Sequence, residues 1–141
     1  MNALHRHQQS LPRLAACLFA IVLLPMLSCS GLRERKTALN DTLRLYERAI
    51  RWGQHEKIGK FFDAKLRTSI PVELLKNVRI SSYTVQSFDL NNKKNHLRQN
   101  VEIKYYFLDR MQVKTVIDKQ LWTFHKDAQA WLRQNEFPKL Q

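Results

Sequence analysis

The sequence predicts an α+β domain in which helices at its start pack on a curved antiparallel sheet. Apolar residues between positions 37 and 52 recur at helical spacing. From Asn77 onward the apolar residues alternate instead, in segments joined by short polar turns. Helices followed by hairpin-linked strands are typical of domains that carry their helices on one face of an antiparallel sheet.

Three helical segments are expected before the sheet. The first runs over about 37–52, and Gly53 is well placed as its C-terminal stop. Its apolar stripe repeats at helical spacing and consists of Leu39, Leu43, Tyr46 and Ile50. A second helix is expected over 54–64. Pro71 can begin one further turn over 72–76, because proline is tolerated at a first helical position.

Four strands are expected after the helices. The first, over 78–90, changes its alternation twice, which predicts a β-bulge or a bend. The second, over 97–107, alternates without interruption. The third, over 111–124, changes phase near Asp118, and the last runs over 130–135. Because short turns join consecutive strands, we expect an antiparallel meander.

The beginning of the chain has the layout of a secretory leader. Arg6 and Arg13 precede an apolar run over 14–27, and small residues follow it. This run is shorter than the roughly 20 residues that a membrane-spanning helix needs. Ser28 ends this leader and Cys29 follows it directly, which resembles the lipobox of bacterial lipoproteins.

The lipobox resemblance implies cleavage before Cys29 and a diacylglycerol on its sulfur. The leader then covers 1–28, a polar lipidated tether covers 29–36, and one folded domain covers 37–141. Ser30, the next residue, implies the periplasmic face of the outer membrane, with the inner membrane as the alternative. Two or three acyl chains anchor a protein stably, whereas one holds only marginally. We therefore expect a membrane anchor at Cys29; a leader that is cut without lipidation is the alternative.

The chain after the leader is basic and contains a single cysteine. Cys17 leaves with the leader, so Cys29 has no partner for an intramolecular disulfide. The remaining 22 basic residues face 12 acids, which gives a net charge of +10. Nucleic acid is the usual partner of so basic a chain, but an exported and tethered protein rarely meets it. We therefore expect another envelope protein or an anionic surface as partner, and no nucleic acid.

The domain also resembles the NTF2-like superfamily, a cone-shaped α+β fold. The resemblance rests on the element order over about 37–136 and on Trp122-Thr123-Phe124 followed by Trp131-Leu132 in the last hairpin. It extends to small uncharacterised proteobacterial lipoproteins of similar length. The resemblance implies a fold that serves both enzymes and binding modules. A cystatin-like sheet around one helix is the neighbouring alternative.

The sequence contains no catalytic motif. It has no G-x-S-x-G or S-x-x-K pattern and no glycine-rich phosphate loop. His55, His96 and His125 lack ligand spacing, so we expect no metal and no cofactor. NTF2-like enzymes often place an acid inside the cone as general base. Glu102 is expected to face outward in a cross-strand ion pair. Asp118 is the acid to follow, because a buried unpaired carboxylate would mark a functional cavity.

The aromatic residues have two interpretations, a packed core or the lining of a cavity or an interface. The candidate cavity or interface residues are Trp52, Tyr83, Tyr105, Phe107 and Trp122, with Asp118 among them. Trp131 belongs to the same core-or-cavity set; alternatively, Trp131 and Tyr106 lie on the exposed face of the sheet, where aromatic residues favour a partner interface. We expect a non-catalytic docking or accessory module. A carrier or sensor of a small apolar ligand is the alternative, and an NTF2-like enzyme ranks last.

Overall fold

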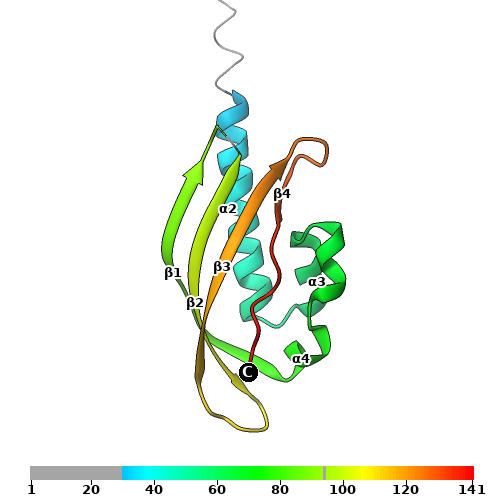
Figure 1. The fold of residues 1–141 in the computed structure, drawn as a ribbon, viewed down its shortest axis with the longest axis vertical. Helices are drawn as coiled ribbons and strands as arrows, with labels where there is room; N and C mark the ends of the chain where they lie inside the picture. The colour runs from blue at the N-terminus through cyan, green and yellow to red at the C-terminus, as the bar shows by residue number, and fades with distance from the viewer. Residues whose placement is uncertain (1–29, 94) are drawn as a thin grey trace, which may run out of the picture. The chain divides into compact units, whose positions relative to one another are not determined.

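The computed structural model describes residues 30–93 and 95–141 of the chain (Figure 1). The expected leader over 1–28 and Cys29, the expected site of lipid attachment, lie outside these described residues. Residues Thr37–Gln141 form one compact unit, which contains the whole sheet.

A helix, several short helical turns and a four-stranded antiparallel sheet follow one another, which confirms the α+β fold class. The arrangement is compatible with an NTF2-like or cystatin-like cone. The turn expected over 72–76 is confirmed as α4. In chain order the elements are α2 (Ser30–Arg51), α3 (His55–Ile58), the 3₁₀ turns η2 (Gly59–Phe61) and η3 (Ala64–Ser69), α4 (Val72–Lys76), β1 (Val78–Asn91), β2 (His96–Phe107), β3 (Lys114–His125) and β4 (Ala130–Arg133).

Helix α2 begins at Ser30, earlier than the expected Thr37. The segment 30–36, which we expected as a polar tether, is therefore helical. Its Leu, Arg, Glu and Lys residues are good helix formers, and a helix leaves their charges in water. The expected stop is confirmed, because α2 ends at Arg51 and Gly53 adopts a φ of +62°.

The expected second helix over 54–64 is wrong. The chain forms the single turn α3 and then the two 3₁₀ turns. Between them Phe62 is extended and makes a parallel bridge to Arg133. The Asp63 amide donates to the carbonyl of Arg133 at 3.0 Å, and the Asp63 side chain accepts from the Lys65 amide to begin η3. Pairing with a distant strand thus breaks the helix, which local periodicity does not reveal.

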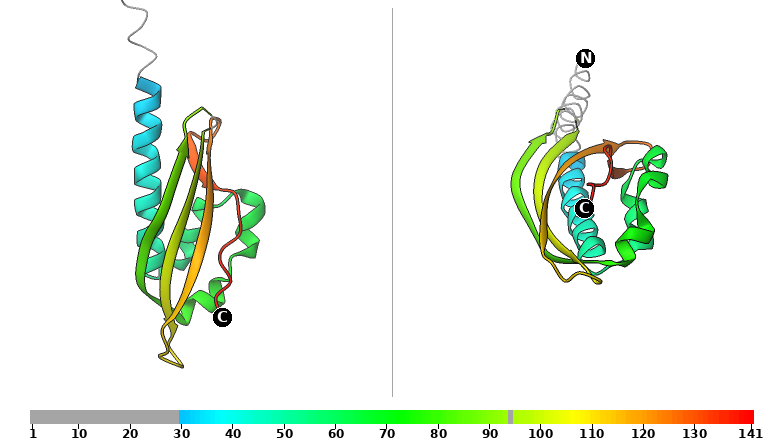
Figure 2. Two further views of the ribbon diagram at one scale, coloured as in Figure 1. Left: turned by 60° about the vertical axis from the view of Figure 1, so that its left-hand side comes forward. Right: turned by 60° about the horizontal axis from the view of Figure 1, so that its bottom comes forward.

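The sheet is an antiparallel meander in the order β1-β2-β3-β4, as expected. Register shifts between Ile80 and Ser82 and between Val85 and Ser87 confirm the irregular first strand. Strand β1 is an edge strand. Within the compact unit, the sheet curves around α2, and the short helical turns lie beyond the edge formed by β4 (Figure 2).

Strand β3 keeps one phase throughout, so the expected change of phase near Asp118 is wrong. It pairs with β2 without a register shift, with Val101 opposite Asp118 and Gln99 opposite Gln120. Buried positions alternate regularly from Asp118 to Phe124. Two of these positions carry polar residues, which is why an apolar pattern alone suggested a slip.

Side chains from α2 and the sheet fill the interior between them. The Tyr46 ring lies edge-on to Trp122, with centroids 5.1 Å apart, and edge-on to Phe61 at 5.5 Å. Trp131 is only 4% exposed and packs on Phe124, with ring centroids 5.6 Å apart. The alternative place of Trp131 on the outer face of the sheet is therefore wrong, because β4 turns this side chain toward the core.

Candidate functional site

Asp118, the acid singled out from the sequence, lies inside the domain and is paired. Asp118 is 1% exposed, and its side chain faces the fully buried Arg133 at the end of β4. Arg133 Nη1 donates to Oδ2 of Asp118 at 2.7 Å, and Nη2 donates to Oδ1. Two parallel charge-assisted bonds of this kind are strong and directional. A carboxylate held in this way is not the unpaired acid that a general base requires.

Arg133 makes further hydrogen bonds around this ion pair. Its Nη1 also donates to the Tyr46 hydroxyl at 2.7 Å. Its Nη2 donates to the carbonyl of Glu136 at 2.7 Å, and its Nε to that of Asn135 at 3.2 Å. Burial raises the pKa of the Tyr46 hydroxyl far above its ordinary value, although the Arg133 charge opposes the shift. Every guanidinium nitrogen of Arg133 is therefore engaged, and Tyr46 stays neutral beside it.

Two glutamines extend the polar network across the sheet. Gln120 Nε2 donates to Oδ2 of Asp118 at 2.7 Å and to the Tyr83 hydroxyl at 3.0 Å. Gln120 Oε1 accepts from Gln99 Nε2 at 2.7 Å and from Trp122 Nε1 at 3.0 Å. A buried network with its partners in place holds one arrangement of the core. Its chemistry is structural, because it leaves Asp118 no role as a free acid.

The aromatic candidates separate into a core group and one exposed residue. Trp122, Tyr105 and Phe107 are buried. Tyr83 is half-buried at the margin of the polar network, where burial raises its pKa well above the ordinary value. Trp52 is 73% exposed at the end of α2. Trp122, Tyr105 and Phe107 thus pack in the core, Tyr83 lies at its margin, and Trp52 faces water.

Three other acids of the sheet and its turns, Glu102, Asp89 and Asp109, lie on the surface. Glu102 faces outward as expected, but its 3.7 Å ion pair is with Lys104 of the same strand, which corrects the expected cross-strand pair. Asp89 and Asp109 are exposed near turns. Residues 30–93 and 95–141 contain no group of three or more His, Cys, Asp and Glu side chains that could hold a metal ion. Within the same ranges, no helix is both long and apolar enough to cross a membrane.

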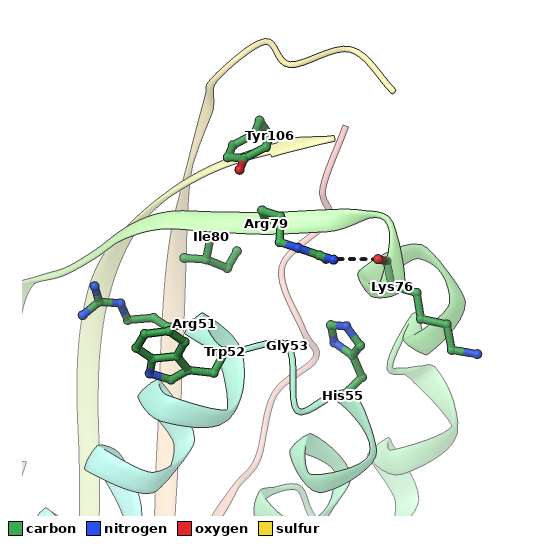
Figure 3. A pocket seen from close by; sticks show the side chains of 8 residues that line it. All are labelled: Arg51, Trp52, Gly53, His55, Lys76, Arg79, Ile80 and Tyr106. Carbon is green, nitrogen blue, oxygen red and sulfur yellow. Dashed lines mark hydrogen bonds between the residues drawn. The ribbon is translucent and has the colours of Figure 1, made fainter. Parts of the chain in front are cut away.

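A pocket of about 420 Å³ opens where the end of α2 approaches the start of β1 (Figure 3). Its walls come from the turn after α2, from α3, from the end of α4 and from β1 and β2. We call it the basic pocket; it is lined by Arg51, Trp52, Gly53, His55, Lys76, Arg79, Ile80 and Tyr106. The turn needs a glycine, because Gly53 has a positive φ and a Cβ there would lie 3.3 Å from Nε2 of His55.

Three cationic side chains and no acid line the basic pocket. Arg51 pairs with Glu47 at 3.3 Å and Lys76 with Glu73 at 2.7 Å. Both ion pairs are exposed, so they contribute little to the stability of the fold, and either cation can leave its carboxylate for another anion. Arg79 is held differently: its Nη1 donates to two backbone carbonyls, at 3.1 Å and 2.9 Å. The ion pairs among the described residues give Arg79 no carboxylate.

His55 reports the positive potential of the basic pocket. Burial lowers the pKa of its imidazole, and the charges of Arg79 and Lys76 lower it further. Its Nδ1 is buried without a hydrogen-bond partner in the part of the chain that the structure describes. A neutral ring next to two cations indicates a site that favours an anion.

Sequence reasoning found Trp52 but not the basic pocket around it. The available signal was a set of basic residues on both sides of the Gly53 turn, among them Arg51, Lys76 and Arg79. These residues come together because the short helical turns bring the start of β1 back toward the end of α2 (Figure 3). That return is a tertiary feature with no periodic signal.

Comparisons with family models, curated proteins and solved structures found no match for this chain.

Proposed function

We propose that this chain is a lipid-anchored envelope protein whose folded domain serves as a non-catalytic docking module. One contrast supports the docking role. Asp118 is held inside by Arg133, whereas the basic pocket presents Trp52 and cationic side chains to solvent. Aromatic and arginine side chains that meet water are enriched in binding surfaces.

The carrier and enzyme alternatives both need an empty space or a free reactive group inside the domain. Tyr46, Trp122 and Arg133 occupy the interior and are fully buried. Their packing and hydrogen bonds favour a structural role for the interior. The outer surface is then the better candidate for binding.

The proposed localisation rests on the sequence. The leader over 1–28 and the lipobox-like residues before Cys29 support export and lipidation. Ser30 supports the periplasmic face of the outer membrane, with the inner membrane as the second choice. Membership of the NTF2-like superfamily belongs to the same proposal and is supported by the order of helices and strands.

Replacing Cys29 tests lipidation and membrane localisation. We expect Cys29→Ala to abolish incorporation of labelled palmitate and to move the protein from the membrane fraction to the soluble fraction, because no acyl chain remains. Cys17→Ala is the matched control, since the chain has only two cysteines and this one lies inside the leader. Membrane retention of Cys29→Ala, or an unacylated mass for the native protein, would contradict the anchor.

Site-specific photo-crosslinking in cells tests the docking role. A photoreactive residue in place of Trp52 should form a reproducible adduct with one envelope component, because Trp52 borders the basic pocket. The matched control carries the same residue in place of Ile117, which is also exposed but does not line the pocket. The adduct at position 52 should disappear with Arg79→Gln. Equal adducts at both positions, or none at position 52, would refute docking at this site.

A further inference from the structure

The basic pocket has the size and the charge of a small-anion site. Its volume of about 420 Å³ lies within the range of small-molecule pockets, roughly 300–1,000 Å³. Trp52, which lines it, is 73% exposed, so the pocket opens to solvent. No acid lines it, so nothing in its wall repels a negative group.

Arg79 is the best-placed cation for such a group. Two backbone carbonyls fix its Nη1, which sets the plane of the guanidinium on the His55 side of the pocket (Figure 3). Its Nε and Nη2 then remain to bind a ligand. A fixed guanidinium offers two parallel donors to an oxyanion and loses little conformational entropy on binding.

Arg51 and Lys76 lie on opposite sides of the pocket, and their charged groups point away from Arg79 (Figure 3). Either side chain has to turn inward to add its charge to the site. Their side chains are 46% and 59% exposed in weak ion pairs with Glu47 and Glu73. Because exposed pairs are worth little, a doubly charged ligand can compete for both cations. A phosphate monoester carries about −1.5 to −2 charges at pH 7 and three acceptor oxygens, so it can engage more than one of them.

An apolar wall accompanies the cations. The exposed Trp52 and the half-buried Ile80 and Tyr106 line the same pocket. Indole and phenol rings offer faces on which a planar or apolar group can pack. The pocket therefore pairs an oxyanion site with a surface for the group attached to it.

We propose that the basic pocket binds a phosphomonoester, with its phosphate against Arg79 and its organic group against Trp52. This ligand chemistry rests on the docking role proposed for the same pocket. It is common to a soluble phosphate ester and to a lipid headgroup that ends in a phosphate.

Binding can be measured on the full chain in nonionic detergent. Trp52 is the exposed member of the three tryptophans, since Trp122 and Trp131 are buried. Phenyl phosphate should therefore produce a saturable change in tryptophan emission, and inorganic phosphate should bind more weakly. Equilibrium dialysis with labelled phosphate gives a second readout that does not depend on Trp52.

Two variants separate a specific site from general charge attraction. Arg79→Gln should weaken phenyl phosphate binding at least tenfold, because the fixed guanidinium is lost. Arg98→Gln is the matched control: it is also an exposed arginine of the sheet, but it does not line the pocket. Equal loss in both variants, or the same emission change with sodium chloride at equal ionic strength, would overturn the proposal.

Vesicles distinguish the two sources of the phosphate. With the protein anchored in phosphatidylcholine vesicles, added phosphatidic acid should shift the Trp52 signal if the ligand is a lipid headgroup. A response to phenyl phosphate alone assigns a soluble ester; a response to neither overturns the proposal. Loss of the anchor in Cys29→Ala would leave phosphate binding in detergent intact, so failure of the proposed localisation and failure of the ligand are separable. Likewise, phosphate binding without a Trp52 adduct would refute docking but not the ligand.

Discussion

Two arginines of this domain show opposite uses of the same side chain. Arg133 is fully buried, and all three of its guanidinium nitrogens donate to defined acceptors. Arg79 is exposed, and only its Nη1 makes hydrogen bonds among those described. The buried arginine orders the core, whereas the exposed one keeps donors for a ligand.

The cost of burial explains this difference. A charge taken out of water loses several kcal/mol of solvation, which only a well-placed partner offsets. Asp118 and Arg133 meet that condition because their opposite charges are paired. Tyr46 also accepts a hydrogen bond from Arg133, and Gln120 donates one to Asp118. Arg79 needs no such partner, because it is exposed and water solvates its charge. The buried Asp118–Arg133 pair thus stabilises one arrangement of the core, whereas the exposed Arg79 remains accessible to solvent.

The largest expected effect is on the buried side of this comparison. Arg133→Met should lower the free energy of unfolding by about 3–5 kcal/mol, because it leaves the Asp118 carboxylate buried without a partner. Urea unfolding followed by tryptophan emission measures the loss. Arg79→Met, the same exchange on the surface, should change the free energy of unfolding by less than about 0.5 kcal/mol.

A double variant sharpens the interpretation. Asp118→Leu with Arg133→Met removes both charges, so it should be more stable than Arg133→Met alone. Should the double variant lose the sum of the two single losses, the ion pair would not be the cause. Equal losses for Arg133→Met and Arg79→Met would remove the distinction between the two arginines.

A smaller effect is expected from the hydroxyl beside the ion pair. Tyr46→Phe removes the acceptor that Arg133 Nη1 contacts at 2.7 Å but keeps the ring that packs on Trp122. We expect a loss of about 1–2 kcal/mol in the free energy of unfolding, typical of a buried donor that loses one of its acceptors. Thermal or urea unfolding checks the value. No loss would mean that Asp118 alone satisfies Nη1.

The smallest expected effect is on how stability depends on pH, and it comes from His55 in the basic pocket. Because the pKa of His55 is lowered in the folded state, the unfolded chain takes up the proton first as pH falls. The contribution of His55 to stability is therefore fully present above the unfolded pKa of about 6.5 and declines below it. Titration by NMR should place the His55 pKa below that of a free imidazole.

Substitution of a neighbouring cation tests the cause. Arg79→Gln should raise the pKa of His55, since the Arg79 charge disfavours the imidazolium. Arg98→Gln, outside the pocket, should leave it unchanged. If Arg79→Gln also leaves the pKa of His55 unchanged, the Arg79 charge does not act on this imidazole, and its part in the positive potential of the pocket is not supported.

Much of the fold could be predicted because its signals are local. The stripe through Leu39 and Tyr46 indicated the core face of α2, and the alternation over 97–107 indicated β2. The irregular phase of the first strand predicted its register shifts. Each of these follows from the spacing of apolar residues within one element. The segment 54–64 was mispredicted because its shape depends on a bridge to Arg133.

The candidate site was less accessible to sequence reasoning. Asp118 was recognised as unusual, but its partner Arg133 carries no sign of burial in the sequence. For Trp131 the sequence leaves both the core and the outer face open, because the phase of a short last strand is ambiguous. Trp52 is among the aromatic candidates, yet the sequence does not group the cations around it, because Arg51, Lys76 and Arg79 belong to different elements.

By itself the sequence determined the class of fold, the core face of the long helix, the order of the strands and the expectation of a lipid anchor at Cys29. Only the tertiary structure decided that Asp118 is bound by Arg133 and that Arg51, His55, Lys76 and Arg79 line one pocket. The reason is physical. Periodicity reports which side of an element avoids water, whereas the pairing of charges depends on the register and curvature that bring distant elements together.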